Sequence, residues 1–234
     1  MRFIIMDTPK EIGETIAKDF EELLKKKPDA IFGLATGSTP LPLYAALIED
    51  YKAGKISFKD AKSFNLDEYV NAPKEEDTYR YFMKTNLFEH VDFKEGANHF
   101  PSFENMKTYD KSIDEAGGID LQILGIGRDG HVGFNEPDTP FDSLTHLAEL
   151  TENTREANAR FFKGGEETPH EAITMGLKTI YKARHIILIA SDLTKVDAIR
   201  SLKKGVKDLA WPCTSLLTHP NVDIYLTKEL FAAI

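Results

Sequence analysis

Short apolar runs alternate along the chain with longer stretches in which apolar residues recur every three or four positions. A short continuous run is typical of a buried strand, and the wider spacing is typical of a helix with one buried face. The runs predict strands at residues 3–6, 31–35, 63–66, 121–126, 185–190 and 222–227. The spaced stretches predict helices at residues 10–27, 40–51, 79–89, 106–115, 193–203 and 228–233.

This alternation predicts an α/β fold, with a mostly parallel sheet flanked by helices. No low-complexity linker or internal repeat divides the chain, so we expect residues 1–234 to form a single domain. In such sheets ligands bind beyond the carboxyl ends of the strands. Four stretches that follow expected strands carry reactive or ligand-binding side chains, namely TGSTP, DEYV, GIGRDGHVGFNEP and SDLTK.

Composition and charge limit the classes of ligand. Acidic residues outnumber basic ones, 38 against 29, and the net charge of -9 speaks against nucleic acid and membrane partners, which are bound by basic faces. The single cysteine, Cys213, excludes a disulfide framework. MRFIIMDTPK has too short an apolar run for a signal peptide, and no stretch approaches the ~20 apolar residues of a membrane span. We therefore expect a cytoplasmic protein.

The turn TGSTP is a candidate anion site. Gly37 lets the backbone approach a ligand closely, while Thr36, Ser38 and Thr39 offer hydroxyls beside the free N–H groups of the next helix. We expect Thr39 to cap that helix and Pro40 to lie in its first turn. A capped turn without a ligand is the alternative, and the Gly-Lys-Ser/Thr ending of a Walker loop is missing.

In FNLDEYV, Asp67 and Glu68 follow an apolar run directly. Adjacent residues in an extended chain point to opposite faces, so only one of the two is expected to enter a site. A carboxylate there is a candidate general base, above all if burial raises its pKa. A solvated loop acid or a helix cap is the alternative.

The letters GIGRDG have the G-x-G-x-x-G spacing of a dinucleotide site, but their context is wrong for one. That fingerprint requires a helix to begin at its last glycine, whereas Pro137 disfavours helix at the residue before it. Asp129 and Glu136 would also place negative charge near a pyrophosphate. We therefore reject the nucleotide interpretation.

The same stretch places Asp129, His131 and Glu136 on a glycine-rich turn after a buried strand. Histidine exchanges protons near neutral pH, and a neighbouring carboxylate orients its ring and stabilises its cation. A purely structural histidine is the alternative, although three ionisable groups in so short a stretch speak against it. A metal site is a second alternative, but no H-E-x-x-H motif or Cys/His pairing supports one.

Basic residues for an anion are also present. Lys195 lies one turn after Asp192, a candidate helix cap. A positive charge at the start of a helix is unfavourable, so the charge of Lys195 is either balanced by a pair with Asp192 or placed to bind an anion. In TREANARFF, Arg155 and Arg160 are a candidate clamp on the same ligand. Isolated basic residues are mostly solvated, so these assignments depend on the motifs above.

Together these motifs resemble the glucosamine-6-phosphate deaminase family, the glucosamine/galactosamine-6-phosphate isomerases. The matching stretches are LATGSTP, FNLDEYV, GIGRDGHVGFNEP, NTREANARFF and the lysine of SDLTK, in that order from Leu34 to Lys195. The resemblance implies a Rossmann-like fold of the kind shared with 6-phosphogluconolactonase and ribose-5-phosphate isomerase. It also implies that D-glucosamine 6-phosphate and water give D-fructose 6-phosphate and ammonia, in amino-sugar catabolism, without a cofactor or metal.

The resemblance assigns roles to the matching residues. Asp67 is the expected base that moves a proton between C2 and C1 during enolisation. His131 is expected to open the sugar ring, assisted by Glu136 and by Asp129, which either takes part or only orients His131. The expected phosphate-binding residues are Thr36, Gly37, Ser38, Thr39, Arg160 and Lys195.

Two features depart from the regulated members of that family. Basic residues after the FNEP motif help those members to bind the effector N-acetylglucosamine 6-phosphate, but DTPFDSLTHLAELTENTR contains His146, Ala148 and Glu149 and no Lys or Arg before Arg155. The chain also lacks the longer tail of the oligomeric members after its last expected strand. We therefore expect a monomer without that allosteric site.

Two other functions remain possible on a similar fold. The hydrolase 6-phosphogluconolactonase shares the Asp-Gly-His arrangement but not the FNEP ending, so Glu136 distinguishes the two. A non-enzymatic sugar-phosphate sensor would be expected to lose one of the acids, yet Asp67, His131 and Glu136 are all present.

Overall fold

The structure, a computed structural model, describes residues 1–162 and 167–234. Its centre is a sheet of seven strands in which every neighbouring pair is parallel. In order across the sheet these are β1 (Arg2–Met6), β10 (Val222–Thr227), β9 (His185–Ala190), β6 (Leu121–Leu124), β2 (Ile31–Leu34), β3 (Lys62–Asn65) and β5 (Asn98–His99). The predicted α/β fold with a mostly parallel sheet is confirmed.

The direction in which the chain crosses the sheet reverses between β2 and β6. From β2 the chain moves outward through β3 to β5, and from β6 it moves outward on the other side through β9 to β10. Such a reversal opens a crevice at the carboxyl ends of the two central strands, where ligands bind in sheets of this kind. The segments after β2 and β6 therefore border the expected site.

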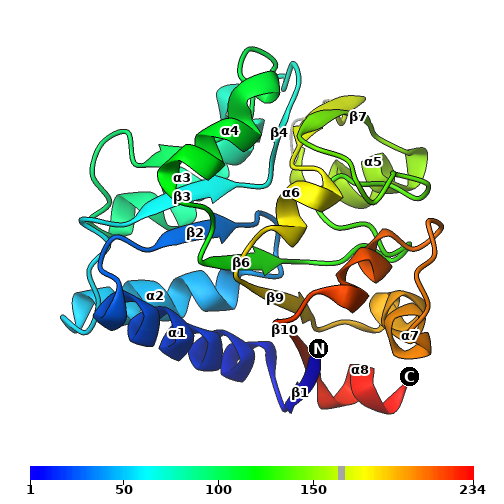
Figure 1. The fold of residues 1–234 in the computed structure, drawn as a ribbon, viewed down its shortest axis with the longest axis horizontal. Coiled ribbons are helices and arrows are strands. Elements are labelled where there is room, and N and C mark those ends of the chain that lie inside the picture. Colours follow the sequence, from blue (N-terminus) through cyan, green and yellow to red (C-terminus); the bar gives the residue numbers. More distant parts are fainter. Residues whose placement is uncertain (163–166) are drawn as a thin grey trace.

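Helices lie on both sides of this sheet (Figure 1). Helices α1 and α2 pack side by side on one face, and α4 and α6 lie on the opposite side. The α-helices are α1 (Pro9–Lys26), α2 (Leu41–Lys52), α3 (Tyr79–Asn86), α4 (Met106–Ala116), α5 (Glu152–Asn158), α6 (Leu177–Tyr181), α7 (Val196–Lys204) and α8 (Lys228–Ala232). Short 3-10 helices are η1 (Glu75–Asp77), η2 (Phe88–His90), η3 (Ala159–Phe161), η4 (Leu193–Lys195) and η5 (Pro212–Thr218).

Helix α1 shows how the apolar spacing positions an element. Its buried face carries Ile12, Ile16, Phe20 and Leu24, which recur every four residues and pack in the main apolar cluster. The side chain of Thr8 caps the helix by accepting a hydrogen bond from the backbone N–H of Glu11. The helix predicted at residues 10–27 therefore forms with a shift of one residue.

A second, antiparallel sheet was not predicted. It consists of β4 (Asp67–Tyr69), β8 (Glu171–Thr174) and β7 (His146–Glu149) in this order. Each strand has three or four residues, too few for an alternating pattern to stand out from the polar letters around it. Beside this sheet lies a separate apolar cluster of Tyr69, Phe134, Ala148, Leu150, Phe162 and Ala172.

Several elements differ from the prediction, and the helix predicted at residues 79–89 is divided into α3 and η2. Helix α2 begins at Leu41, and Pro40 rather than Thr39 holds the N-cap position, without a side-chain hydrogen bond. The cause is an extra turn, in which the backbone N–H of Leu41 donates to the carbonyl of Ser38. The helix predicted at residues 193–203 is divided into η4 and α7, and the two-residue strand β5 was missed. No helix in the described ranges combines the length and apolar character needed to cross a membrane.

Candidate active site

A cleft of about 490 Å³ opens at the carboxyl ends of β2, β6 and β9, at the reversal in strand order. Residues from α5 and η3 border it as well, so it is built from segments far apart in the sequence. The predicted site residues that line it are Thr36, Gly37, Ser38, Thr39, Asp67, His131, Arg160 and Lys195. Asp129 and Glu136 are not among the lining residues, and both contact His131 instead.

The turn from Thr36 to Thr39 forms one wall of the cleft. Gly37 has a φ of +89°, which side-chain-bearing residues rarely adopt, and a Cβ built on it would have no atom within 4 Å. The glycine is therefore required by the backbone conformation and leaves open space. Ser38 lies opposite Arg160, whose Nη2 donates to the Ser38 Oγ at 3.4 Å. The hydroxyls, the start of α2 and this guanidinium are thus presented together, as an anion site requires.

Asp67 and Glu68 point in different directions, as predicted. Asp67 is buried and lines the cleft, and its burial, with the charge of Glu68, raises the pKa of its carboxyl group to about 8. Glu68 instead accepts hydrogen bonds from the backbone N–H groups of Tyr69, Tyr79 and Arg80, and thereby ties β4 to the start of α3. Only Asp67 therefore has the position and the pKa of a general base.

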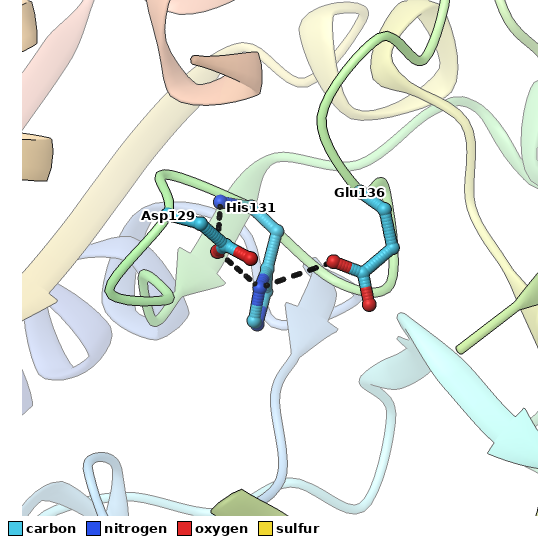
Figure 2. Close-up of side chains that lie close together, drawn as sticks. All are labelled: Asp129, His131 and Glu136. Carbon is cyan, nitrogen blue, oxygen red and sulfur yellow. Dashed lines mark hydrogen bonds and ion pairs between the residues drawn. The ribbon is translucent and has the colours of Figure 1, made fainter. Parts of the chain in front are cut away.

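His131 is held by two carboxylates that converge on the same ring nitrogen (Figure 2). Its Nδ1 lies 2.7 Å from the Asp129 Oδ1 and 3.7 Å from the Glu136 Oε2. Figure 2 shows the two acids on opposite sides of the imidazole ring. Because Nδ1 is occupied by Asp129, Nε2 is the nitrogen left to exchange a proton with a ligand.

The two carboxylates differ in their surroundings. Burial alone would raise the pKa of Asp129, but the hydrogen bond and charge of His131 outweigh it and lower that pKa to about 2. Asp129 is therefore ionised at every pH of interest and suited to orient the imidazole. Glu136 is buried, its Oε1 faces Thr151, and its Oε2 has no hydrogen-bond partner in the described structure.

The glycines that resemble a dinucleotide fingerprint serve the histidine instead. A Cβ on Gly127 would lie only 2.2 Å from the Nδ1 of His131, so the ring packs directly on the backbone there. Gly130 has a φ of +80°, and a Cβ on it would lie 2.9 Å from the Trp211 ring. The structure describes all of residues 125–145 and shows no helix there. This supports the rejection of a dinucleotide site.

Lys195 and Arg160 both reach the cleft, whereas Arg155 does not. Burial lowers the pKa of Lys195, and the charges of Arg128 and Arg160 lower it further, although Asp192 raises it. Asp192 caps η4 by accepting from the backbone N–H of Thr194, as predicted. The predicted clamp of two arginines is wrong for Arg155, which pairs with Glu167 outside the cleft.

Several lining residues were missed by sequence reasoning. Tyr79 follows the cap of α3, and its hydroxyl donates a hydrogen bond to the Tyr69 hydroxyl at 3.1 Å. Asn153 and Asn158 project from α5, and the Asn153 Nδ2 donates to the Asp129 Oδ2 at 3.4 Å. No signal in the sequence pointed to them, because the helix α5 was not predicted and the contact of Asn153 with Asp129 joins separate segments.

Asp129, His131 and Glu136 are also arranged as possible metal ligands. One ligand atom from each lies within 4.8 Å of the other two. The short hydrogen-bond distance from Asp129 to Nδ1 is nevertheless typical of a carboxylate that orients an imidazole. The cleft thus combines an oriented histidine, a buried carboxylate with a raised pKa, and an anion site.

Comparison with known proteins agrees with this inventory. A family model described as glucosamine-6-phosphate isomerases/6-phosphogluconolactonase matches residues 7–225. Glucosamine-6-phosphate deaminase of Thermoanaerobacter pseudethanolicus is 45% identical, with 100% of this chain and 95% of the relative covered. The corresponding protein of Lysinibacillus sphaericus is 46% identical, with 96% and 98% covered.

Solved structures give the same result. A monomeric glucosamine-6-phosphate deaminase superposes with a TM-score of 0.96 at 35% identity, and each chain is covered over 100% of its length. 6-Phosphogluconolactonase of Thermotoga maritima superposes with a TM-score of 0.75 at 20% identity over 97% of each chain, a likeness of fold alone. The chain belongs to the glucosamine-6-phosphate isomerase/6-phosphogluconolactonase family, and within it to the branch of the glucosamine-6-phosphate deaminases.

Proposed function

We propose that this protein is a glucosamine-6-phosphate deaminase, which converts D-glucosamine 6-phosphate and water into D-fructose 6-phosphate and ammonia in amino-sugar catabolism. The relatives support this activity by identity over nearly the whole chain. The observation that carries it is the joint presence, in one cleft, of Asp67 and of His131 with its two carboxylates. We further propose that residues 1–234 act as one unit and that the protein is cytoplasmic.

The substrate phosphate binds the turn from Thr36 to Thr39, Arg160 and Lys195. The observations behind this assignment are the hydrogen bond from Arg160 to Ser38 and the position of Lys195 in the wall of the cleft. Anchoring the phosphate fixes the distant carbons C1 and C2 in the cleft and so converts binding energy into correct positioning.

His131 opens the sugar ring. Its Nε2 takes the proton of the anomeric hydroxyl and returns a proton to the ring oxygen, while the bond from C1 to that oxygen breaks and C1 becomes an aldehyde. Asp129 holds Nδ1 and stabilises the imidazolium that forms in between. We assign Asp129 this orienting role because it contacts Nδ1 and does not line the cleft. Glu136, 3.7 Å from Nδ1, adds a second negative charge near the ring.

Asp67 then isomerises the open chain. Its carboxylate removes the proton from C2 while the aldehyde oxygen at C1 accepts a proton from the substrate's ammonium group, which gives an enolamine. Asp67 then delivers its proton to C1, which leaves a hydroxyl group at C1 and a protonated ketimine at C2. Water adds to C2, the bond from C2 to nitrogen breaks, and ammonia departs to leave D-fructose 6-phosphate. None of these steps needs an external oxidant or reductant, and the acid–base groups of the cleft supply the proton transfers, so we expect no cofactor and no metal. A base with a pKa of about 8 can both take and return a proton near neutral pH.

Ammonia release from D-glucosamine 6-phosphate by the purified protein tests this function directly. A coupled assay for D-fructose 6-phosphate should give the same rate, because the two products form together. The matched control is Asp67→Asn, which keeps the shape of the side chain and removes the base. If the protein hydrolyses 6-phosphogluconolactone and releases no ammonia from D-glucosamine 6-phosphate, it is the hydrolase instead. If it binds sugar phosphates and turns over neither compound, it is a sensor.

A further inference from the structure

Arg128 lines the cleft with a cationic side chain to which the proposed reaction gives no role. It follows Gly127 in the turn after β6, and β6 lies between β9 and β2 in the sheet. Lys195 follows β9, and Ser38 follows β2. The guanidinium of Arg128 is thus supplied by the strand between the two halves of the proposed phosphate site.

Within residues 1–162 and 167–234, the charge of Arg128 has no acidic partner. Arg128 is exposed and forms no ion pair or hydrogen bond with any residue in the described ranges. Its neighbour Asp129 is occupied by His131 and Asn153. The chain has 38 acidic and 29 basic residues, yet none of the described acids pairs with this arginine, so its guanidinium can donate to a ligand in the cleft.

Like charges are gathered at this place. Burial lowers the pKa of Lys195 and the charges of Arg128 and Arg160 lower it further, while Asp192 and Asp129 act in the opposite direction. Asp192 offsets part of the repulsion among these three cations of the cleft, and a doubly charged anion relieves more of the remaining repulsion than a singly charged one. The arrangement therefore favours the ligand with the greater charge.

We infer that Arg128 is a further substrate-binding residue, which contacts the phosphate and makes the cleft select its doubly charged form. This inference rests on the proposed function, because that function supplies the phosphate ester. A phosphate group carries about -1.5 to -2 charges at pH 7 and offers three acceptor oxygens, enough for several donors at once.

The test is to compare Arg128→Ala with the parent protein in steady-state kinetics. We expect KM for D-glucosamine 6-phosphate to rise about 5–50-fold, the range for loss of one hydrogen bond to a charged group at an exposed site. The change should appear in KM rather than in kcat. A fall in kcat at unchanged KM would mean that Arg128 acts through its neighbour Asp129, and it would overturn the inference.

One further ligand and one further variant measure the charge selection. The affinity for D-glucosamine 6-sulfate, which has the same shape and one negative charge, should fall less in Arg128→Ala than the affinity for the phosphate ester. Arg128→Lys, which keeps the charge but not the fork of donors, should lie between the parent and Arg128→Ala. Equal losses on the phosphate and sulfate esters would overturn the selection of the doubly charged form.

A matched control and a direct binding measurement complete the design. Arg200→Ala removes another exposed arginine, on α7 and outside the cleft lining, and should keep the parental KM. Competition or thermal-shift titration with inorganic phosphate reports the anion site without any turnover. If the parent binds phosphate more tightly than Arg128→Ala but releases no ammonia, the proposed function fails and the role of Arg128 stands. Equal phosphate binding by both proteins would overturn that role.

Discussion

Two adjacent acids, Asp67 and Glu68, have different roles because successive side chains of a strand point to opposite faces. Both lie in β4, yet one faces the cleft and the other ties the start of α3 by three backbone hydrogen bonds. Burial without donors raises the pKa of Asp67, whereas the backbone donors partly offset the effect of burial on Glu68. Environment rather than residue type therefore decides which carboxylate can act as a base.

Replacing Asp67 by asparagine should lower turnover by about 10²–10⁴, the usual size of general-base catalysis. Exchange of the C2 proton with solvent should stop, because that exchange requires the same carboxylate. In the parent, the exchange rate should fall as the pH drops through about 8, where Asp67 becomes protonated. NMR of the substrate in deuterated water measures the exchange.

The control for that experiment is Glu68→Gln, which changes the neighbouring acid outside the cleft. It should weaken the tie to α3 and lower stability, but it should still exchange the C2 proton. Normal exchange in Asp67→Asn would exclude Asp67 as the base.

A stability measurement tests the environment of Asp67 independently of catalysis. Its folded-state pKa, about 8, lies above its ordinary value of 3.8. The folded state therefore binds this proton more tightly, and the resulting stability, full below about pH 4, is lost as the pH rises through 8. Asparagine does not ionise, so the stability of Asp67→Asn relative to the parent should increase between pH 5 and 9 by more than ~1 kcal/mol. Urea unfolding at several pH values checks this, and a difference that is independent of pH would contradict it.

His131 is tested by separating ring opening from the later chemistry. His131→Asn should severely slow the normal cyclic substrate, because Nε2 is lost as the proton carrier. An analogue without the C5 hydroxyl cannot close to the pyranose, so the variant should lose much less activity on it. Asp67→Asn should be impaired on both compounds. Ammonia release from each compound provides the measurement, and equal losses of His131→Asn on the two would remove the ring-opening role.

At the scale of elements, the anion site is shared by segments that meet only in the folded chain. Arg160 comes from η3, Lys195 from η4 and Ser38 from the turn after β2. Arg155, only five positions before Arg160, points outside the cleft and pairs with Glu167. The neighbouring arginine is therefore a natural comparison for the one in the cleft.

Lys195→Ala and Arg160→Ala should each weaken substrate binding by about 1.5–3 kcal/mol, the usual contribution of a hydrogen bond to a charged group. Arg155→Ala should keep the parental KM, since it removes an equal charge from a nearby position outside the cleft. Glucosamine without the phosphate should be a poor substrate for the parent and should show little difference among the variants. Steady-state kinetics with both sugars checks this. If all the variants lose equally on both sugars, the two residues do not bind phosphate.

The elements that could be predicted from the sequence are those with a continuous apolar run or a long periodic face. Strand β9 and helix α1 have such patterns, and both form where they were expected. Strand β7 was missed because four residues with two charged or ionisable side chains carry too little pattern. Asp67 could be located because it directly follows an apolar run. Asn153 could not, because its contact with Asp129 joins residues that sequence periodicity does not connect.

Across the whole molecule, the protein carries the same negative sign of charge as its proposed substrate, and the cleft is where basic residues gather. The net charge is -9, so a sugar phosphate meets a repulsive average field, while Lys195, Arg160 and Arg128 all line the cleft. A local cationic cleft on an acidic protein attracts anions over short distances and is screened beyond about 8–10 Å at physiological salt. Selection of an anionic substrate is thus confined to the cleft.

The protein should be a monomer with hyperbolic kinetics, indifferent to N-acetylglucosamine 6-phosphate. The solved deaminase that resembles it with a TM-score of 0.96 is monomeric, and residues 138–154 contain no lysine or arginine to bind a phosphorylated effector. Sedimentation velocity gives the oligomeric state, and rate curves with and without the effector give the regulation. A stable hexamer, or a sigmoidal curve relieved by the effector, would contradict this prediction.

Strand β1 has a single neighbour in the seven-stranded sheet, β10, and this affects how the protein folds during synthesis on the ribosome. Strand β1 is at the edge of the sheet, and its ion pair from Arg2 to Asp223 spans 221 residues. At ~5–20 residues per second, the first strand waits roughly 10–45 s for its partner to be made. During that interval its N–H and C=O groups form an unpaired edge, a template for pairing with other chains. We expect the nascent chain to depend on chaperones until the penultimate element of the fold has emerged.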